Sequence, residues 1–129
     1  MRTITQEPES TWELDAHSYA DHVDDVLALS GRIRKAFTVK ASDTLVTKTM
    51  LGVFGCVPAF DTYFKKGFGV WTFNMKSLGR VAEFYRQNAD VIDLHRVSTL
   101  DFDTGRPTDR RYTRAKVIDM IFFVEGGSD

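Results

Sequence analysis

The stretch from Ser42 to Phe68 is the most apolar segment of the chain and sets the strongest constraint on its fold. Ser42 or Asp43 can begin a helix, because a short oxygen-bearing side chain accepts hydrogen bonds from the free amides of a first turn. The apolar side chains that follow form a nearly continuous surface; they are Leu45, Met50, Val53 and Phe54. The pattern therefore predicts a helix that is buried on more than one side.

The residues after Phe54 predict a tight corner and a second helix. Gly55 suits the end of the first helix, because glycine readily adopts the left-handed backbone found there. Pro58 suits the first turn of a new helix, where its missing N–H has no partner to lose. Aromatic residues then recur at helical spacing, at Phe60, Tyr63, Phe64 and Phe68, and Gly67 and Gly69 follow as helix-ending residues. We therefore expect a helix-turn-helix hairpin at the centre of the molecule.

Lys48 borders the apolar face of the first predicted helix. Its ammonium group must therefore reach water or meet a carboxylate. Asp61 could be that partner if the corner folds the second helix back on the first. Two interpretations stay open: Lys48 and Asp61 form a structural ion pair, or they line a pocket with shifted proton affinities. The second interpretation would make the chain an enzyme.

A long helix is expected before the central hairpin, from Ser10 or Thr11 to Phe37. Ser10 and Glu13 resemble a capping box, in which each side chain binds a free amide of the first turn. Apolar residues alternate at spacings of three and four, at Tyr19, Val23, Val26, Ile33 and Phe37. Residues 1–9 are polar, and we expect a flexible arm there.

Two further helices are expected after the hairpin. Asn74 should cap the first, which fades near Leu94 or His95. Residues 98–109 are rich in turn residues, and Thr108 should cap the last helix. The inward positions of this helix are Tyr112, Ala115, Ile118, Ile121 and Phe122, and residues 126–129 should form a disordered tail. The sequence thus predicts one all-α domain over residues 1–129, a compact orthogonal bundle of about five helices.

Composition narrows the classes of function. The formal charge of −1 gives no overall field that favours nucleic acid or a membrane. No uncharged apolar run reaches the roughly 18 residues of a membrane span. Cys56 is the single cysteine, so no internal disulfide can form, and the acidic first 20 residues do not resemble a signal peptide. We expect a soluble cytoplasmic protein.

The densest group of like charges lies near the C-terminal end, at Arg106, Arg110, Arg111, Arg114 and Lys116. In the predicted last helix, Arg110 and Arg114 share one face. Such a patch can bind phosphates. Basic residues at a helix start oppose the helix dipole, so a partner or an acidic loop should satisfy them. Asp101 and Asp103 are the internal candidates, and nucleic acid is the external one.

Two other groups could form a metal site or a reactive thiol, but each also has a simpler structural explanation. His17, Asp21 and Asp25 are spaced by four residues and would share a helix face, as metal ligands can. Exposed charge pairs at this spacing are, however, common on solvated helices. Cys56 precedes the second predicted helix, where a thiol can become reactive, although a buried small apolar side chain is the simpler interpretation.

The sequence contains none of the short catalytic motifs that we sought, including G-x-S-x-G, the phosphate-binding G-x-x-x-x-G-K, H-E-x-x-H and paired C-x-x-C. We therefore predict a module that binds a protein partner or a second copy. Residues 1–31 hold seven acids against Arg2 alone, and this acidic segment could pair with the basic final helix of another copy as a homodimer. The alternatives are nucleic-acid or phosphate binding by the basic cluster, and an enzyme using Lys48 and Asp61. No cofactor or metal is expected.

Overall fold

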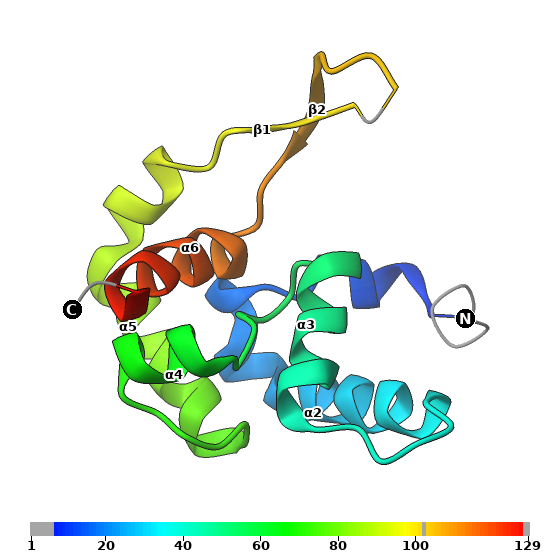
Figure 1. The fold of residues 1–129 in the computed structure, drawn as a ribbon. Helices are drawn as coiled ribbons and strands as arrows, with labels where there is room; N and C mark the ends of the chain where they lie inside the picture. The colour runs from blue at the N-terminus through cyan, green and yellow to red at the C-terminus, as the bar shows by residue number, and fades with distance from the viewer. Residues whose placement is uncertain (1–6, 102, 128–129) are drawn as a thin grey trace.

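The computed structural model describes residues 7–101 and 103–127. The chain is mostly helical, at 64% helix, and the described part has five α-helices and one small two-stranded sheet (Figure 1). The α-helices are α2 (Tyr19–Ala36), α3 (Asp43–Val53), α4 (Thr62–Phe68), α5 (Met75–Leu94) and α6 (Arg114–Gly127). Two 3₁₀-helices, η1 (Glu9–Glu13) and η2 (Ala16–Ser18), precede α2, and strands β1 (Ser98–Leu100) and β2 (Pro107–Arg111) separate α5 from α6. The predicted all-α class is broadly confirmed, whereas the orthogonal arrangement stays a prediction.

The expected first helix is interrupted near its start. Ser10 and Glu13 lie inside η1, whose N-cap is Pro8 and has no side-chain cap, so the predicted capping box is wrong. Asp15 instead begins η2, and its Oδ1 accepts a hydrogen bond from the amide of Ala16 at 2.7 Å. The backbone is extended at Asp15 (φ −160°, ψ 170°), and the carboxylate of Asp15 also accepts from other amides, as described below.

The central stretch forms two helices, but the second begins later than expected. Ser42 caps α3 by accepting from the amide of Leu45. Gly55 has φ +67°, so the left-handed helix stop is confirmed. Pro58 does not begin a helix; α4 starts at Thr62, with Asp61 as its N-cap accepting from the amide of Phe64 at 2.9 Å. The predicted tight corner is therefore wrong.

The link between α3 and α4 passes through the core because side chains satisfy its backbone. Val57 and Phe60 are fully buried. The amide of Phe60 donates to Thr47 Oγ1 at 2.7 Å, and the amide of Ala59 donates to Asp119 Oδ1 at 3.0 Å. Buried backbone groups require such partners, and they allow this segment to stay out of a helix.

The second half of the chain departs most from expectation at residues 98–111. Asn74 caps α5 in a capping box with Ser77, and the cap prediction is confirmed. The predicted turn is present, but two strands flank it, paired antiparallel with Ser98 opposite Arg111. Thr108 lies in β2 and caps nothing helical. Thr113 takes that role for α6, its Oγ1 accepting from the amide of Lys116 at 3.1 Å.

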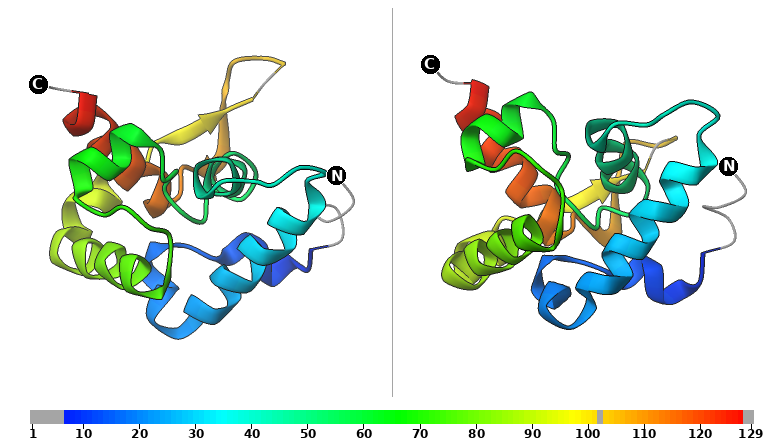
Figure 2. Two further views of the ribbon diagram at one scale, coloured as in Figure 1. Left: turned by 60° about the horizontal axis from the view of Figure 1, so that its bottom comes forward. Right: turned by 90° about the horizontal axis from the view of Figure 1, so that it is seen from below.

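The core is strongly aromatic around α4 and α6, which lie side by side in Figure 1. Phe64, Phe68, Phe84 and Phe122 pack there with ring centroids 4.8–6.0 Å apart. Strands β1 and β2 stand away from these helices (Figures 1 and 2).

Gly126 and Gly127 belong to α6, and the predicted tail at 128 and 129 lies outside the described residues, as does most of the predicted arm at 1–9. Among the described helices, none combines the length and apolarity that a membrane crossing requires.

Candidate interaction surface

Asp15 anchors the start of α6 from a point about 100 residues earlier in the chain. Its Oδ1 accepts from the amide of Ala115 at 2.8 Å, and its Oδ2 accepts from the amide of Arg114 at 2.9 Å. The side chain of Asp15 is only 6% exposed. The carboxylate thus caps η2 and α6 together, which fixes where the chain leaves the sheet.

Arg114 is held inside a polar network rather than presented to solvent. Its Nε donates to Tyr85 Oη and to Asp93 Oδ1, both at 3.0 Å. Tyr85 also donates to Asp93 at 3.0 Å, and burial of Tyr85 raises the pKa of its hydroxyl. Arg114 Nη1 lies 3.2 Å from His17 Nδ1. Because the Nε and Nη1 atoms of its guanidinium group already have partners, Arg114 is poorly placed to bind an external phosphate.

The predicted basic cluster is therefore divided. Arg114 and Lys116 lie in α6, whereas Arg106, Arg110 and Arg111 lie in or beside β2 and are exposed. The expectation that Arg110 and Arg114 share a helical face is wrong, because Arg110 is in a strand. Within the ranges that the structure describes, these three exposed arginines form no ion pair.

The acidic loop residues do not neutralise these arginines. Asp101 accepts from the amides of Asp103 and Thr104 at 2.9 and 3.0 Å, and these hydrogen bonds lower the pKa of its carboxyl group. The carboxylate therefore shapes the turn, as an aspartate in a turn commonly does. The internal salt bridges expected from Asp101 and Asp103 do not form among the described side chains.

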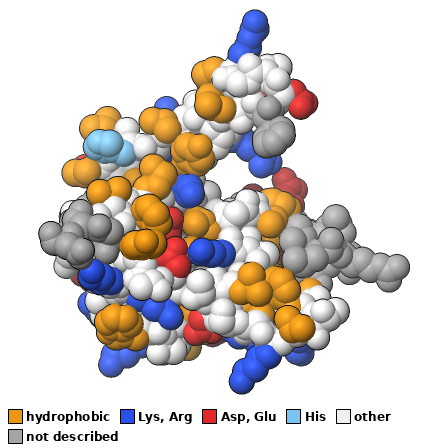
Figure 3. All heavy atoms as spheres, in the orientation of Figure 1, with side chains coloured by type: hydrophobic (Ala, Val, Ile, Leu, Met, Phe, Trp, Pro, Cys, Tyr) orange, Lys and Arg blue, Asp and Glu red, His pale blue; other side chains and the backbone are white. Residues whose placement is uncertain are grey.

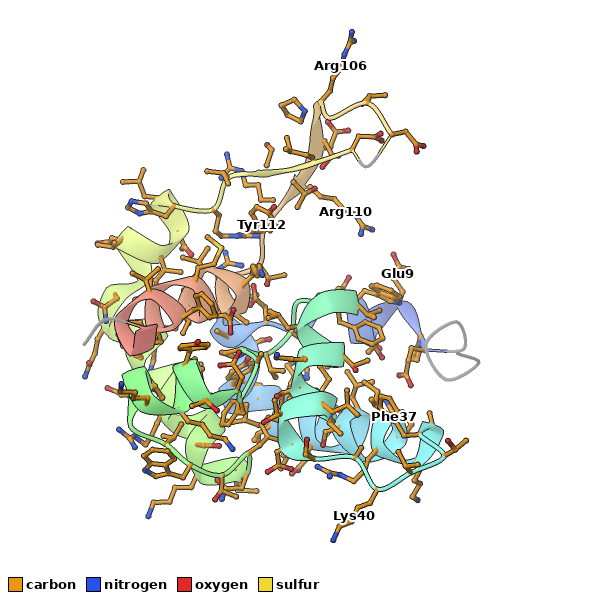
Figure 4. The ribbon with its side chains drawn as sticks, in the orientation of Figure 1. Glu9, Phe37, Lys40, Arg106, Arg110 and Tyr112 are labelled. Atoms are coloured by element: carbon orange, nitrogen blue, oxygen red, sulfur yellow. The ribbon has the colours of Figure 1, made fainter. Side chains whose placement is uncertain are left out.

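Residues 98–101 and 103–111, called the arm below, have no core of their own among the described side chains. Thr99 and Thr108 are half-buried and lie 2.6 Å apart through their hydroxyl oxygens, while the other described side chains of both strands are exposed. Leu100 is 61% exposed, although it is large and apolar. Figure 4 shows Arg106 at the far end of the arm and Arg110 nearer its base.

The base of the arm is fixed by contrast. Arg96 Nε donates to the carbonyl of Tyr112 at 2.7 Å, and the amide of Tyr112 donates to the carbonyl of Val97 at 3.0 Å. These contacts join the two chain segments where they meet α5 and α6. An apolar surface continues from the arm onto the end of α5, with Val97 58% and Leu94 80% exposed (Figure 3).

A hollow of about 920 Å³ lies between η1, η2 and α2. Glu13 and Asp25 line it, as do His17 and His22, while Lys35 is its only basic residue that has no carboxylate partner among the described side chains. The other basic residue in its lining, Arg32, binds Glu7 through two hydrogen bonds of 2.7 and 2.8 Å, and this contact lowers the pKa of Glu7.

Lys48 and Asp61 both lie near a third charged residue that the sequence did not reveal. Asp119 is buried, and desolvation raises the pKa of its carboxyl group; the amide of Ala59, Lys116 and Lys48 oppose this rise, whereas Asp61 adds to it. Lys48 is exposed, and Asp61 caps α4. They form no ion pair with each other among the described residues, so their role in a pocket stays a prediction.

The predicted metal ligands do not come together in the structure, and the predicted reactive thiol is buried. His17 lies in η2 beside Arg114, whereas Asp25 pairs with His22 at 2.9 Å. In the described ranges, no group of three histidine, cysteine or acidic side chains could hold a metal ion. Cys56 is completely buried, and this burial raises the pKa of its thiol to about 12. A thiol in this state is not nucleophilic at neutral pH.

Comparison of the chain with protein-family models, with curated protein sequences and with solved structures gave no significant match. The functional argument therefore depends on the surface itself. Its main features are the basic arm, which is fixed at its base, and the hollow between η1, η2 and α2, which is formed by the N-terminal part of the chain.

Proposed function

We propose that this chain is a non-catalytic cytoplasmic interaction module that associates with a second copy of itself. In this proposal the arm of each copy enters the hollow between η1, η2 and α2 of the other. Glu13 and Asp25 in the hollow then face Arg106, Arg110 and Arg111 of the arriving arm.

The single observation that carries the proposal is the uncovered arm. A two-stranded hairpin is marginally stable in water unless something packs on one of its faces. Apart from the half-buried Thr99 and Thr108, the described side chains of its two strands are exposed, and the strands have open edges that can pair with another chain. Its base is nevertheless anchored to α5 and α6. An arm of this kind is suited to contact a partner.

Charge and shape favour a second copy as that partner. The arm carries three exposed arginines without a carboxylate partner among the described residues, whereas Glu9, Glu13, Asp21 and Asp24 are exposed on η1 and α2. The hollow beside these elements is concave, and the two strands of the arm project from the helices (Figure 1). Trp12 is 39% exposed on η1 and offers an apolar contact for Leu100.

Symmetry doubles this contact. In a two-fold dimer the same two surfaces meet twice, arm to hollow and hollow to arm. A stable interface buries about 1,200–2,000 Å² in total, and two such contacts need supply only about half of that each. Because the facing groups are charged, added salt should weaken the dimer.

Sedimentation equilibrium tests the proposal. The wild type should form a dimer at micromolar concentration, and Arg106→Glu/Arg110→Glu/Arg111→Glu should be a monomer. Lys40→Glu is the matched control, because Lys40 is exposed at the opposite end of the molecule from Arg106 (Figure 4). It should dimerise like the wild type. A monomeric wild type at about 100 μM would refute self-association, since it corresponds to a free energy weaker than roughly 5–6 kcal/mol.

Nucleic-acid or phosphate binding by the arm is the second candidate, and its support is the same set of unpaired arginines. Three phosphate contacts predict a slope of about −2.7 for log K against log salt on duplex DNA. Binding with this slope, together with a monomeric protein, would favour the second candidate over the first. An enzyme that uses Lys48 and Asp61 remains the third, with Asp119 as an added neighbour.

A further inference from the structure

Trp71 is the most conspicuous exposed aromatic residue outside the arm and the hollow. It lies in the loop between α4 and α5, and 69% of it is exposed. The other tryptophan, Trp12, stacks on Phe54 with ring centroids 4.4 Å apart. Exposure of a whole indole costs free energy through its apolar surface. The position of Trp71 therefore indicates a surface where a ligand can cover the ring.

Two cations border this indole. Trp71, Lys76 and Arg80 line a hollow of about 270 Å³ together with Thr72 and Asn74. This volume is close to the lower end of ligand sites, which are roughly 300–1,000 Å³. Figure 3 shows lysine and arginine side chains around apolar surface at the lower left, the region of the loop between α4 and α5. The hollow thus combines a flat ring with positive charge.

Arg80 is held in a fixed position while part of its guanidinium stays available. Its Nη1 donates to the carbonyl of Gly69 at 3.2 Å, and its Cζ lies 5.4 Å from the centre of the Phe68 ring. A guanidinium has five N–H donors, so further donors remain for an anion. Lys76 is exposed and forms no ion pair with another described residue.

Two neighbouring carboxylates are engaged elsewhere: Asp43, which also accepts from the amide of Phe73, and Glu83 on α5. Glu83, one turn further along α5, pairs with Arg86, and Asp43 pairs with Arg34 at 2.6 Å. The backbone amides of Trp71 and Thr72 donate to no other described residue. Local charge and free donors therefore favour an anion beside the indole, although the chain as a whole carries a charge of −1.

We infer that Trp71, Lys76 and Arg80 form a binding site for single-stranded nucleic acid, in which a base stacks on the indole and the adjoining phosphate lies between the two cations. Aromatic stacking with cations along the backbone is the general mode of single-strand binding. A duplex keeps its bases inside and offers no free face to Trp71. The site is separate from the arm and does not depend on self-association.

An anionic membrane is the other partner that an indole and two cations could bind. The small hollow beside the ring favours a base over a lipid surface. Met75, 56% exposed, is the neighbouring large apolar side chain on α5, and an interfacial helix needs a whole apolar face. Phosphatidylserine vesicles are therefore the competing probe in the test.

The experiment is a titration of fluorescein-labelled dT12 followed by anisotropy, at 20 mM salt and at higher concentrations. The wild type should bind, with a slope of log K against log salt of about −0.7 for the one phosphate that lies between the two cations. Trp71→Ala should weaken binding by about 5–150-fold, the range for loss of one stacked base. Lys76→Ala/Arg80→Ala should weaken it and flatten the salt slope.

Matched controls separate this site from the rest of the chain. Lys40→Ala removes an exposed cation that does not line this hollow and should bind dT12 like the wild type, whereas Arg110→Ala tests whether the arm is the binding site instead. In a Trp12→Phe background, dT12 should quench the fluorescence of Trp71. Circular dichroism confirms that each variant is folded.

The inference is overturned by a folded wild type that does not bind dT12 at 20 mM salt, by equal affinity of Trp71→Ala and wild type, or by loss of binding in Arg110→Ala instead. Binding of phosphatidylserine vesicles through Trp71 without binding of dT12 would assign the surface to membranes and overturn it as well.

Discussion

Replacement of Asp15 by alanine removes the acceptor that joins the two ends of the described chain. The amides of Ala16, Arg114 and Ala115 donate to its two oxygens at 2.7, 2.9 and 2.8 Å. All three would lose their partner at a site where Asp15 itself is only 4% exposed. Water can reach such amides poorly, so most of the loss should appear as a lower free energy of unfolding.

The magnitude follows from two helix caps and their charge. A cap contributes about 0.5–2 kcal/mol per helix, and a hydrogen bond to a charged group contributes about 1.5–3 kcal/mol. Because Asp15 caps η2 and α6 with one buried carboxylate, we expect a loss of about 3–4 kcal/mol. For a chain of this length, that corresponds to a fall of about 12–16 °C in Tm.

Urea unfolding followed by circular dichroism measures this loss. Asp15→Asn keeps one acceptor oxygen but places an NH₂ group near the amide of Arg114, so it should lose about half as much. Asp24→Ala is the surface control, because Asp24 is exposed and has no ion pair among the described residues. It should change stability by less than about 0.5 kcal/mol. A loss below about 1 kcal/mol in Asp15→Ala would refute the capping argument.

Three further substitutions and one thiol reaction test other parts of the fold. Gly55→Ala places a Cβ 2.9 Å from Thr113 at φ +67° and should lower the free energy of unfolding, measured in urea, by about 2–4 kcal/mol. Gly31→Ala has open space around it and should raise the free energy of unfolding by up to about 1 kcal/mol. Asp119→Asn should become more stable relative to wild type as the pH rises from 3.5 to 7. Burial raises the pKa of the Asp119 carboxyl group, so the folded wild type is favoured while this group is protonated and loses stability as it ionises. A difference in stability that does not change with pH would contradict this. Cys56 should react with a thiol reagent in urea but not in the native state, since burial raises its pKa to about 12.

Sequence signals that act within one turn predicted structure well. Ser42 and Asn74 cap the helices that they were expected to cap, and Gly55 and Gly69 end helices with positive φ. In each case the residue satisfies a backbone group or a dihedral angle a few positions away. Such a signal does not depend on the rest of the fold.

Signals that depend on distant partners failed. Pro58 is compatible with a first helical turn, but Thr47 and Asp119 supply acceptors that let residues 57–60 stay outside a helix in the core. Thr108 is a good cap by type, yet its hydroxyl pairs with Thr99 across the hairpin. Neither outcome can be derived from local sequence, because the deciding partners lie 9–60 residues away.

The candidate surfaces were only partly visible in the sequence. The sequence predicts a basic group that contains the exposed arginines at 106, 110 and 111. It also places Arg114 in this group, although Asp93 and Tyr85 engage Arg114. The sequence does not predict the role of Asp15, and its one local signal is the residue type, because aspartate favours helix starts. Its contact with Arg114 spans 99 positions and leaves no periodic trace.

A mixing experiment with two charge-reversed proteins tests the proposed dimer most directly. One protein carries Arg106→Glu/Arg110→Glu/Arg111→Glu, and the other carries Glu13→Lys/Asp25→Lys. Each alone sets like charges between arm and hollow and should sediment as a monomer of about 14.7 kDa. Mixed in equal amounts, each acidic arm meets a basic hollow and each wild-type arm meets an acidic one, so a heterodimer of twice that mass should form. If both proteins remain monomeric after mixing while the wild type dimerises, the arm does not enter the hollow.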